Sequence, residues 1–240
     1  GNITYIITKM QHMDIAQVAK NLLHVIVDPN AHNKSNAELY FWKQEIKKFE
    51  NWYDGKKRLY NFPFPEEAQK EKRFSHRENA LYTWLNLFQA KKYLSDLQLT
   101  PDAFKGKKVL DVGCGPFPNL MAFEESDRHG IDPLINSYQE VGFPIERWEK
   151  DGYHYHNAYS ESMPFPDFSF DAVVSVNAID HVDDFSKTAQ EIKRILKPDG
   201  IFQMHIHYHG KTTTEPIELN DEVFFKFYGS VPSLKRIFDS

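Results

Sequence analysis

Apolar residues recur every three or four positions in two segments of the first hundred residues, which predicts two long amphipathic helices. The first helix begins at Ser35, which stands three residues before Glu38 in the spacing of a capping box. Asp54-Gly55 ends this helix, and the second covers residues 75–97. The apolar stripes consist of Leu39, Trp42, Ile46 and Phe49 in the first helix and Leu81, Trp84, Leu85 and Phe88 in the second.

After residue 104 the pattern changes to short apolar strands that alternate with helical segments. Such alternation is typical of βαβ units with right-handed crossovers, so we predict an α/β fold: a Rossmann-like, doubly wound, mostly parallel sheet with an N-terminal helical extension. The expected strands are residues 107–113, 128–132, 153–159, 170–176 and 201–209, and the expected helices are residues 119–126, 134–142 and 185–197.

Glycine content and aromatic content separate the same two regions. Residues 1–104 contain two glycines, Gly1 and Gly55, and are rich in aromatic residues. We therefore predict two domains: a helical, aromatic-rich lid or extension over residues 1–104, and a cofactor-binding core over residues 105–240. A plainer interpretation is that most of these aromatic side chains only pack against the core.

Composition narrows the classes of partner. A formal net charge of −5 disfavours nucleic acid, since phosphate binding requires a basic surface. No apolar run is long enough to cross a bilayer, so no membrane partner is expected. Cys114 is the single cysteine, which suits a reducing compartment, and we predict a cytoplasmic protein.

A glycine turn follows the first strand of the core, in VLDVGCGPFPN. In parallel sheets ligands bind beyond the carboxyl ends of the strands. Gly113 and Gly115 allow close approach of a ligand to the backbone, and Asp132 ends the next strand, where an acid binds ribose hydroxyls. A dinucleotide site would have a third glycine where Pro118 stands, and Asp111 suits a cationic or amino group better than a phosphate. A dehydrogenase-like nucleotide enzyme is the less favoured alternative.

Two further segments carry a family resemblance. ESMPFPDFSFDAVVSVNAIDHVDD and EIKRILKPDGIFQM, together with the glycine turn, resemble class I S-adenosylmethionine (SAM)-dependent methyltransferases, most closely the methyltransferase-11-like group, over residues 105–208. The resemblance implies that SAM is the cofactor and S-adenosylhomocysteine the product. It also implies a binding site in which Asp111, Gly113 and Gly115 flank the methionine part, Asp132 holds the ribose, Tyr159, Ser160 and Glu161 line the adenine, and Asn177 presents backbone to the sulfonium side.

The chain departs from this family pattern at three places. Tyr159 stands where the group usually has an acid, so the adenine amino contact passes to Glu161 or to backbone. Pro116-Phe117-Pro118 replaces a more glycine-rich turn and stiffens the loop. The fold normally has two more strands after the fifth, but residues 209–240 leave room for a helix and one strand, which predicts a shortened or rearranged C-terminal end.

Methyl transfer to a hydroxyl needs a base. His181, oriented by Asp180, and His209 follow the fourth and fifth core strands and are the predicted catalytic residues. Alternation also puts His205, His207 and His209 on one face of their strand, where imidazoles could bind a metal. Packing inside the fold is the favoured interpretation, and no metal is expected.

We therefore predict an enzyme that methylates a hydroxyl of a small molecule or sugar. Two alternatives stay open: a SAM-binding protein without transferase activity, and a methyltransferase that acts on nitrogen or carbon of a metabolite. The methyl acceptor and the oligomeric state do not follow from the sequence.

Overall fold

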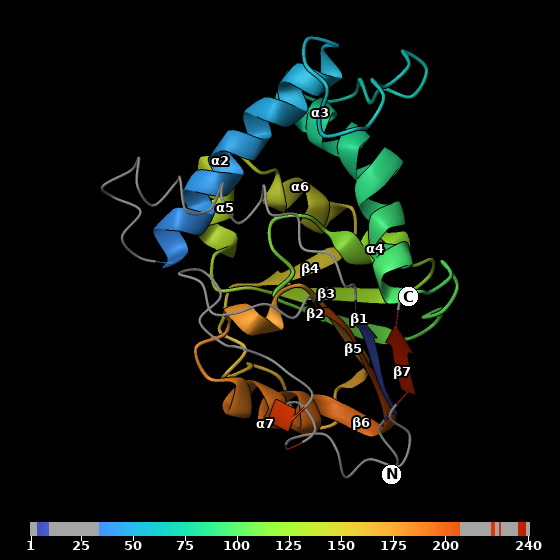
Figure 1. Ribbon diagram of the computed structural model, residues 1–240, viewed down its shortest axis with the longest axis vertical. Helices are drawn as coiled ribbons and strands as arrows, with labels where there is room; N and C mark the ends of the chain where they lie inside the picture. The colour runs from blue at the N-terminus through green and yellow to red at the C-terminus, as the bar shows by residue number, and fades with distance from the viewer. Residues whose placement is uncertain (1–3, 10–33, 207–221, 224–225, 227–234, 239–240) are drawn as a thin grey trace.

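The computed structural model describes residues 4–9, 34–206, 222–223, 226 and 235–238. Seven strands form one sheet in the order β4-β3-β2-β5-β6-β1-β7, and every pair in it is parallel (Figure 1). The strands are β1 (Thr4–Lys9), β2 (Lys108–Val112), β3 (Asp127–Ile131), β4 (Tyr153–His156), β5 (Phe170–Val176), β6 (Leu196–Ile206) and β7 (Lys235–Phe238).

Helices cover both faces of the sheet, as Figure 1 shows. α2 to α6 lie over one face and α7 lies over the other, so the predicted fold class, a doubly wound α/β sheet with an N-terminal helical extension, is confirmed. The helices are α2 (Lys34–Tyr53), α3 (His76–Trp84), the π-helical η1 (Leu85–Gln89), α4 (Ala90–Leu97), the 3-10 turn η2 (Asn119–Ala122), α5 (Ile135–Val141), α6 (Ile145–Lys150), the 3-10 turn η3 (Ile179–His181) and α7 (Phe185–Ile195).

The expected second helix is present, but it contains a π-helical segment. Ser75 caps it, accepting a hydrogen bond from the Glu78 N–H while the Glu78 side chain accepts from the Ser75 N–H, which is a complete capping box. From Ser75 the chain continues through α3 and η1 into α4, and Gln98 ends it in the left-handed conformation with a φ of 53°.

The helix predicted for residues 119–126 is wrong. Only the four-residue turn η2 forms there, and Phe123 is already extended. Pro116 and Pro118 flank Phe117, and a residue that precedes proline disfavours the helical conformation. A regular helix therefore does not form at the start of the segment. The side chains of Leu120 and Phe123 are fully buried, so the segment fills the core as an irregular loop.

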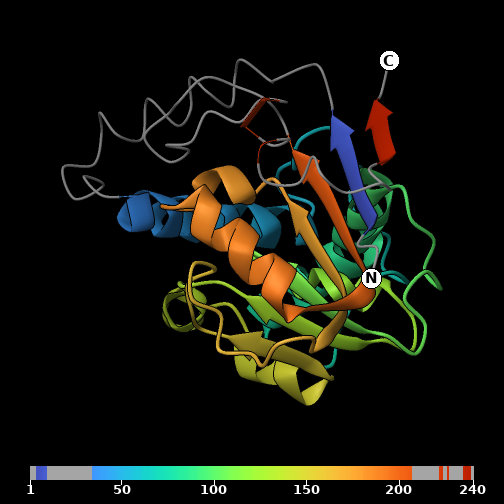
Figure 2. The ribbon, with the colours of Figure 1, turned by 90° about the horizontal axis from the view of Figure 1, so that it is seen from below.

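The edge of the sheet beyond β6 is formed by two strands from opposite ends of the chain. β1, from the start of the chain, pairs with β6, and β7, from its end, pairs with β1 (Figure 2). The rearranged ending expected for the C-terminal region thus takes the form of two parallel strands, of which one comes from the first ten residues. The first hundred residues contribute a strand to the sheet as well as helices.

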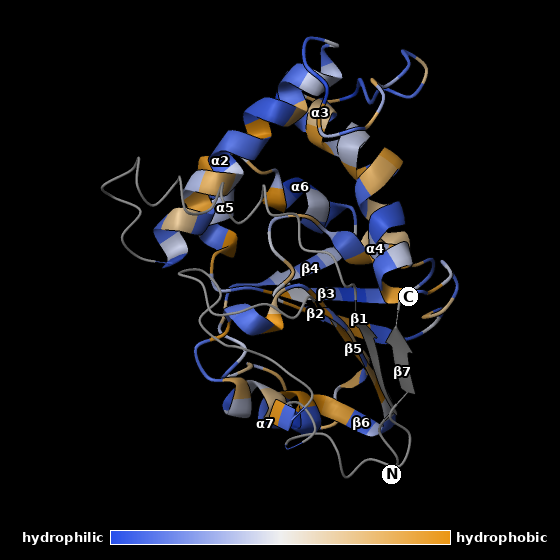
Figure 3. Ribbon diagram, in the orientation of Figure 1, coloured by the Kyte–Doolittle hydropathy of each residue, from blue (hydrophilic) through white to orange (hydrophobic). Residues whose placement is uncertain are grey.

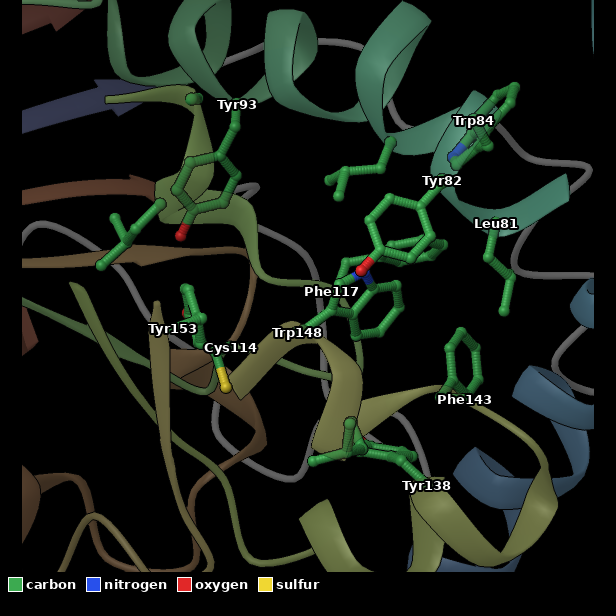
Figure 4. Close-up of a cluster of buried hydrophobic side chains, with 14 of the residues drawn as sticks. Leu81, Tyr82, Trp84, Tyr93, Cys114, Phe117, Tyr138, Phe143, Trp148 and Tyr153 are labelled. Atoms are coloured by element: carbon green, nitrogen blue, oxygen red, sulfur yellow. The ribbon is translucent and has the colours of Figure 1, made fainter. Parts of the chain in front are cut away.

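Two hydrophobic clusters hold the layers together. The larger lies between the sheet and α2 to α6, and half of its buried residues are aromatic; part of it is drawn in Figure 4. The smaller lies beneath α7, whose Phe185, Ala189, Ile192 and Ile195 face β5 and β6. β5 is among the most hydrophobic strands, as expected for a strand buried on both faces, whereas β3 and β4 carry hydrophilic residues (Figure 3).

Candidate functional site

Asp111 lies at the carboxyl end of β2 and is fully buried. The Tyr93 hydroxyl, from α4, donates to its Oδ1 at 2.5 Å. Its Oδ2 is buried and accepts no hydrogen bond from any residue that the structure describes. Burial raises the pKa of Asp111 to about 7, although the hydrogen bond from Tyr93 and the nearby Asn119 amide act in the opposite direction.

Asp132 follows β3, the neighbouring strand, and is also buried. Its Oδ2 accepts from the Gly115 N–H at 3.1 Å, and its Oδ1 accepts from the Leu134 N–H at 2.9 Å. Burial and the nearby Glu38 carboxylate raise the pKa of Asp132, while the two backbone hydrogen bonds and the charge of His181 oppose the rise. The two predicted cofactor-binding acids therefore meet at one edge of the sheet, on either side of the glycine turn.

The glycine turn has the left-handed backbone that its sequence predicts. Gly113 has a φ of 70° and Gly115 a φ of 61°. A Cβ at Gly113 would lie 2.4 Å from the Ala178 Cβ, in the loop that follows β5. The turn and that loop are therefore packed against each other with no space for a side chain at Gly113.

The Phe117 side chain of the Pro-Phe-Pro segment anchors the glycine turn in the hydrophobic core. Its side chain is 2% exposed and lies inside the aromatic cluster of Figure 4. The ring makes edge contacts with Phe49 of α2 at 5.6 Å and with Phe143 at 5.5 Å between centroids. The Tyr155 hydroxyl donates to the Pro116 carbonyl at 2.9 Å. The glycine turn is thus attached to the helical region and to β4.

α2 lies against the same site. A Cβ at Gly115 would lie 3.8 Å from the Trp42 indole. The Tyr138 hydroxyl donates to the Glu38 Oε1 at 2.7 Å, and Glu38 is close enough to Asp132 to raise its pKa. Sequence reasoning missed Glu38 and Tyr93 as site residues and favoured simple packing for most aromatic residues of the first region, to which Trp42 belongs. The sequence pattern assigned Glu38 only the role of the acid in a capping box with Ser35.

The loop after β5 contributes another buried acceptor. Asn177 has a φ of 49°, and its N–H donates to the His205 carbonyl at 2.9 Å. Its side-chain Oδ1 is buried and has no hydrogen-bond donor within the described ranges. Asp111, on β2, and Asn177, just after the neighbouring strand β5, thus each hold a buried oxygen to which no described residue donates. Such a pair fits a ligand that brings an amino or cationic group, as the methionine part of SAM does.

The residues expected to line the adenine have different surroundings. Tyr159 is 58% exposed. The Ser160 hydroxyl is buried and lies 2.9 Å from the Thr188 hydroxyl on α7. The Glu161 Oε1 accepts from the N–H groups of Asp183 and Asp184, at 2.7 and 3.1 Å. Their role at the adenine stays a prediction.

The predicted catalytic residues lie partly within the described chain. Asp180 and His181 belong to η3, where Asp180 is buried and His181 is half-buried. His181 is close enough to Asp132 to influence its pKa. His207 and His209 lie outside the described residues, and His205 is buried with its Nδ1 3.0 Å from the Asp96 carbonyl of α4.

Comparison with known proteins gives a family for the central part of the chain. Residues 110–204 match the family model described as a methyltransferase domain. The sterol 24-C-methyltransferase ERG6B of Gibberella zeae is 39% identical over 107 residues, which cover 42% of this chain and 27% of that protein. The ubiquinone biosynthesis O-methyltransferase of Dinoroseobacter shibae is 33% identical over 116 residues, which cover 47% of this chain and 45% of that protein.

Among solved structures, the YcgJ protein of Bacillus subtilis superposes with a TM-score of 0.44 at 22% identity, over 59% of this chain and 66% of that chain. The matches span less than half of the length of the curated relatives. None of the helices in the described ranges combines the length and apolar character needed to cross a bilayer. By the family-model match, residues 110–204, which carry the glycine turn and both buried acids, form a SAM-dependent methyltransferase domain, and SAM is the cofactor of this domain.

Proposed function

We propose that this chain transfers the methyl group of SAM to a hydroxyl oxygen of a small molecule or sugar and releases S-adenosylhomocysteine. The observation that carries the proposal is the pair of buried acids, Asp111 and Asp132, beside a glycine turn inside a methyltransferase domain. Burial raises the pKa of both carboxyl groups, so their charged forms are costly in the free protein, and a cationic cofactor compensates that cost.

Each acid has a separate binding role in this proposal. The Asp111 Oδ2 and the Asn177 Oδ1, both buried and with no donor in the described part of the chain, accept hydrogen bonds from the amino group of the methionine part. Asp132 exchanges its bonds with Gly115 and Leu134 for bonds from the two ribose hydroxyls. The protein therefore supplies acceptors for the charged and the hydroxylated part of SAM from adjacent strand ends.

His181 is the proposed base. SAM supplies an electrophilic methyl group on a sulfonium, and the acceptor oxygen forms its new bond to that carbon as the carbon–sulfur bond breaks and its electron pair passes to sulfur. His181 takes the hydroxyl proton at an imidazole nitrogen. Its electrostatic influence on Asp132 supports a position near the cofactor site, and base catalysis contributes about 10²–10⁴ in rate.

C-methylation of an apolar acceptor is a second candidate. The sequence match of 39% identity to a sterol 24-C-methyltransferase favours it, because that relative's name describes transfer to carbon. The Trp42 indole of α2, which borders the glycine turn, would suit a sterol-like apolar face as well as the face of a sugar ring. A role in binding SAM without transfer is the remaining alternative.

The test uses the full chain, SAM labelled in its methyl group, and a panel of hydroxylated metabolites and sugars with sterols alongside. We expect labelled product, with the label on oxygen when the product is analysed by NMR. Asp132→Ala should lower SAM affinity, whereas His181→Gln should lower turnover about 10²–10⁴-fold and leave SAM affinity nearly unchanged.

Label on carbon would transfer the assignment to the second candidate. Tight SAM binding with no labelled product from the panel or from a whole metabolite extract would support the binding-only alternative. Wild-type turnover in His181→Gln would remove this histidine from the mechanism.

A further inference from the structure

A second cluster of chemically active side chains lies away from the glycine turn, on the edge strands β3 and β4. Asp127 and His129 stand two residues apart on β3, so they project from the same face of the sheet. His154 of β4 is the register partner of His129 and therefore projects beside it. Tyr153 and Tyr155 alternate to the opposite face, where they join the aromatic cluster under α2 to α6.

The three side chains bring their ligand atoms together. The His129 Nε2 lies 3.0 Å and the His154 Nε2 lies 3.7 Å from the Asp127 Oδ1, and the three ligand atoms all fall within 4.8 Å of one another. Ligands about 2.0–2.1 Å from a tetrahedral zinc ion are about 3.3 Å apart, so the cluster is close to this geometry. Asp127 and His154 are half exposed, at 49% and 55%, and can adjust to an ion.

A neighbouring side chain also orients the His129 imidazole, as is usual for metal-binding histidines. Its Nδ1 lies 2.9 Å from the His156 Nε2, on the next outward-facing position of β4. A hydrogen bond at one ring nitrogen fixes the tautomer and orientation of the imidazole and directs the other nitrogen to the ion. The His129 Nε2, which points to Asp127, is the nitrogen left for a metal.

We propose that Asp127, His129 and His154 form a binding site for a divalent transition-metal ion, zinc above all. Two imidazoles and one carboxylate suit zinc and similar borderline ions better than magnesium or calcium, which prefer oxygen ligands. Water completes the coordination. Because Asp127 and His129 lie on β3 and His154 lies on the edge strand β4, a bound ion links the two strands.

The position of the cluster gives the metal a structural role. Asp127 begins β3, whereas Asp132 lies beyond its other end, five residues later and on the order of 16 Å away along the strand. β4 ends at His156, whose carbonyl accepts from the Asp132 N–H at 3.1 Å, and the chain then leads to Tyr159. An ion that fixes β4 therefore stabilises the strand pair that carries the cofactor acid.

The experiment is a titration of the untagged, metal-free full chain with zinc alone, followed by calorimetry and by thermal unfolding. We expect binding of zinc and a rise in melting temperature. His154→Gln and Asp127→Asn, both at exposed positions, should each weaken the zinc affinity at least about tenfold and reduce the thermal shift. The matched control is His76→Gln, which removes an exposed histidine whose Nε2 lies 2.7 Å from Asp54 and which, among the described residues, belongs to no group of three such ligands.

Wild-type zinc affinity in both cluster variants would overturn the proposal, since the ion would then bind elsewhere. Absence of zinc binding to the wild-type chain would overturn it as well. A loss of affinity in His76→Gln as large as that in His154→Gln would show non-specific surface binding and would have the same consequence. None of these results depends on the methyl acceptor.

Discussion

At the scale of single residues, the free protein holds carboxyl groups where they are costly. Asp111 is fully buried; its Oδ1 accepts from the Tyr93 hydroxyl, and its Oδ2 has no hydrogen-bond donor among the residues that the structure describes. Its pKa of about 7, against an ordinary value of 3.8, corresponds to about 4 kcal/mol of unfavourable free energy for the charged form. The site is therefore prepared for a ligand at the expense of stability, as binding sites often are.

Asp111→Asn should change how stability depends on pH. Because the folded protein holds the Asp111 proton to a higher pH than the unfolded chain does, the free energy of unfolding falls as pH rises from about 4 to about 7. Asparagine has no such proton, so the variant should lose less stability over this range, by up to about 4 kcal/mol. Urea unfolding at pH 5 and pH 8 measures the difference. Equal losses in the two proteins would contradict the assigned burial of this charge.

Gly113→Ala should be far more damaging than Gly55→Ala. Both glycines have a φ near 70°, so alanine at either position costs about 1–2 kcal/mol for its left-handed backbone. Only at Gly113 would the new Cβ also meet another atom, the Ala178 Cβ at 2.4 Å, whereas Gly55 has open space. Thermal unfolding and SAM binding of the two variants separate the backbone cost from the clash. Similar stability of the two variants would mean that the turn and the loop after β5 yield easily.

At the scale of elements, the helical region and the glycine turn are joined by aromatic packing. Phe117 carries the turn into the cluster formed by α2, α5 and α6, and its ring lies 6.1 Å from Trp42 and 5.7 Å from Trp148 between centroids. The helices therefore help to set the position of the glycine turn. This packing replaces the helix that was expected after the turn.

Phe117→Ala tests that connection. Removing a fully buried phenylalanine costs about 3–5 kcal/mol, because it leaves a cavity among rings that cannot collapse completely. SAM affinity should fall as well, since the turn loses its anchor. Phe64→Ala is the control, because Phe64 is 37% exposed and should lose much less stability. Chemical denaturation of both variants, with SAM titration of the folded ones, decides the result.

Elements that follow local rules could be predicted from the sequence, and those that depend on distant partners could not. The core strands β2 and β5 have compact apolar runs, and α7 has a clear polar and apolar face. β1 has the residues of a strand, TYIITK, but its partner lies near the other end of the chain. The metal cluster was missed for the same reason, since His129 and His154 meet only through strand register.

The site itself was predictable in part. Asp111 and Asp132 were found because strand ends of a parallel sheet meet at one edge. Glu38 and Tyr93 could not be assigned, because nothing local in a helix shows which of its polar residues faces a strand end from another part of the chain.

At the scale of the whole molecule, the predicted division at residue 104 crosses one continuous hydrophobic cluster. Residues of α2, α3 and α4 pack directly on side chains of β2, α5, α6 and β4. Tyr153 and Trp148, which belong to the sheet region, are fully buried beneath this layer. The helices form one side of the core as well as bordering the cofactor site.

A chain that starts at Leu99 should therefore fail to fold. It would expose the aromatic side of the sheet and would also lack β1, so we expect an insoluble product or a molten one that binds the dye ANS and shows no cooperative melting. Calorimetry of the truncated and full chains makes the comparison. A soluble, cooperatively melting fragment that binds SAM would instead establish residues 1–104 as a separable lid.

The place of β1 also has a consequence for how the protein is made. Thr4 pairs with Ile201, 197 positions later, and β1 in turn supports β7. A ribosome releases residues 4–9 long before their partner β6 exists, at about 5–20 residues per second. During that interval of about 10–40 s, the segment TYIITK cannot pair with β6. Synthesis order therefore leaves the backbone hydrogen-bonding groups of this segment unpaired until β6 has been made, and the pairing of β1 with β6 can form only after residues 196–206 emerge.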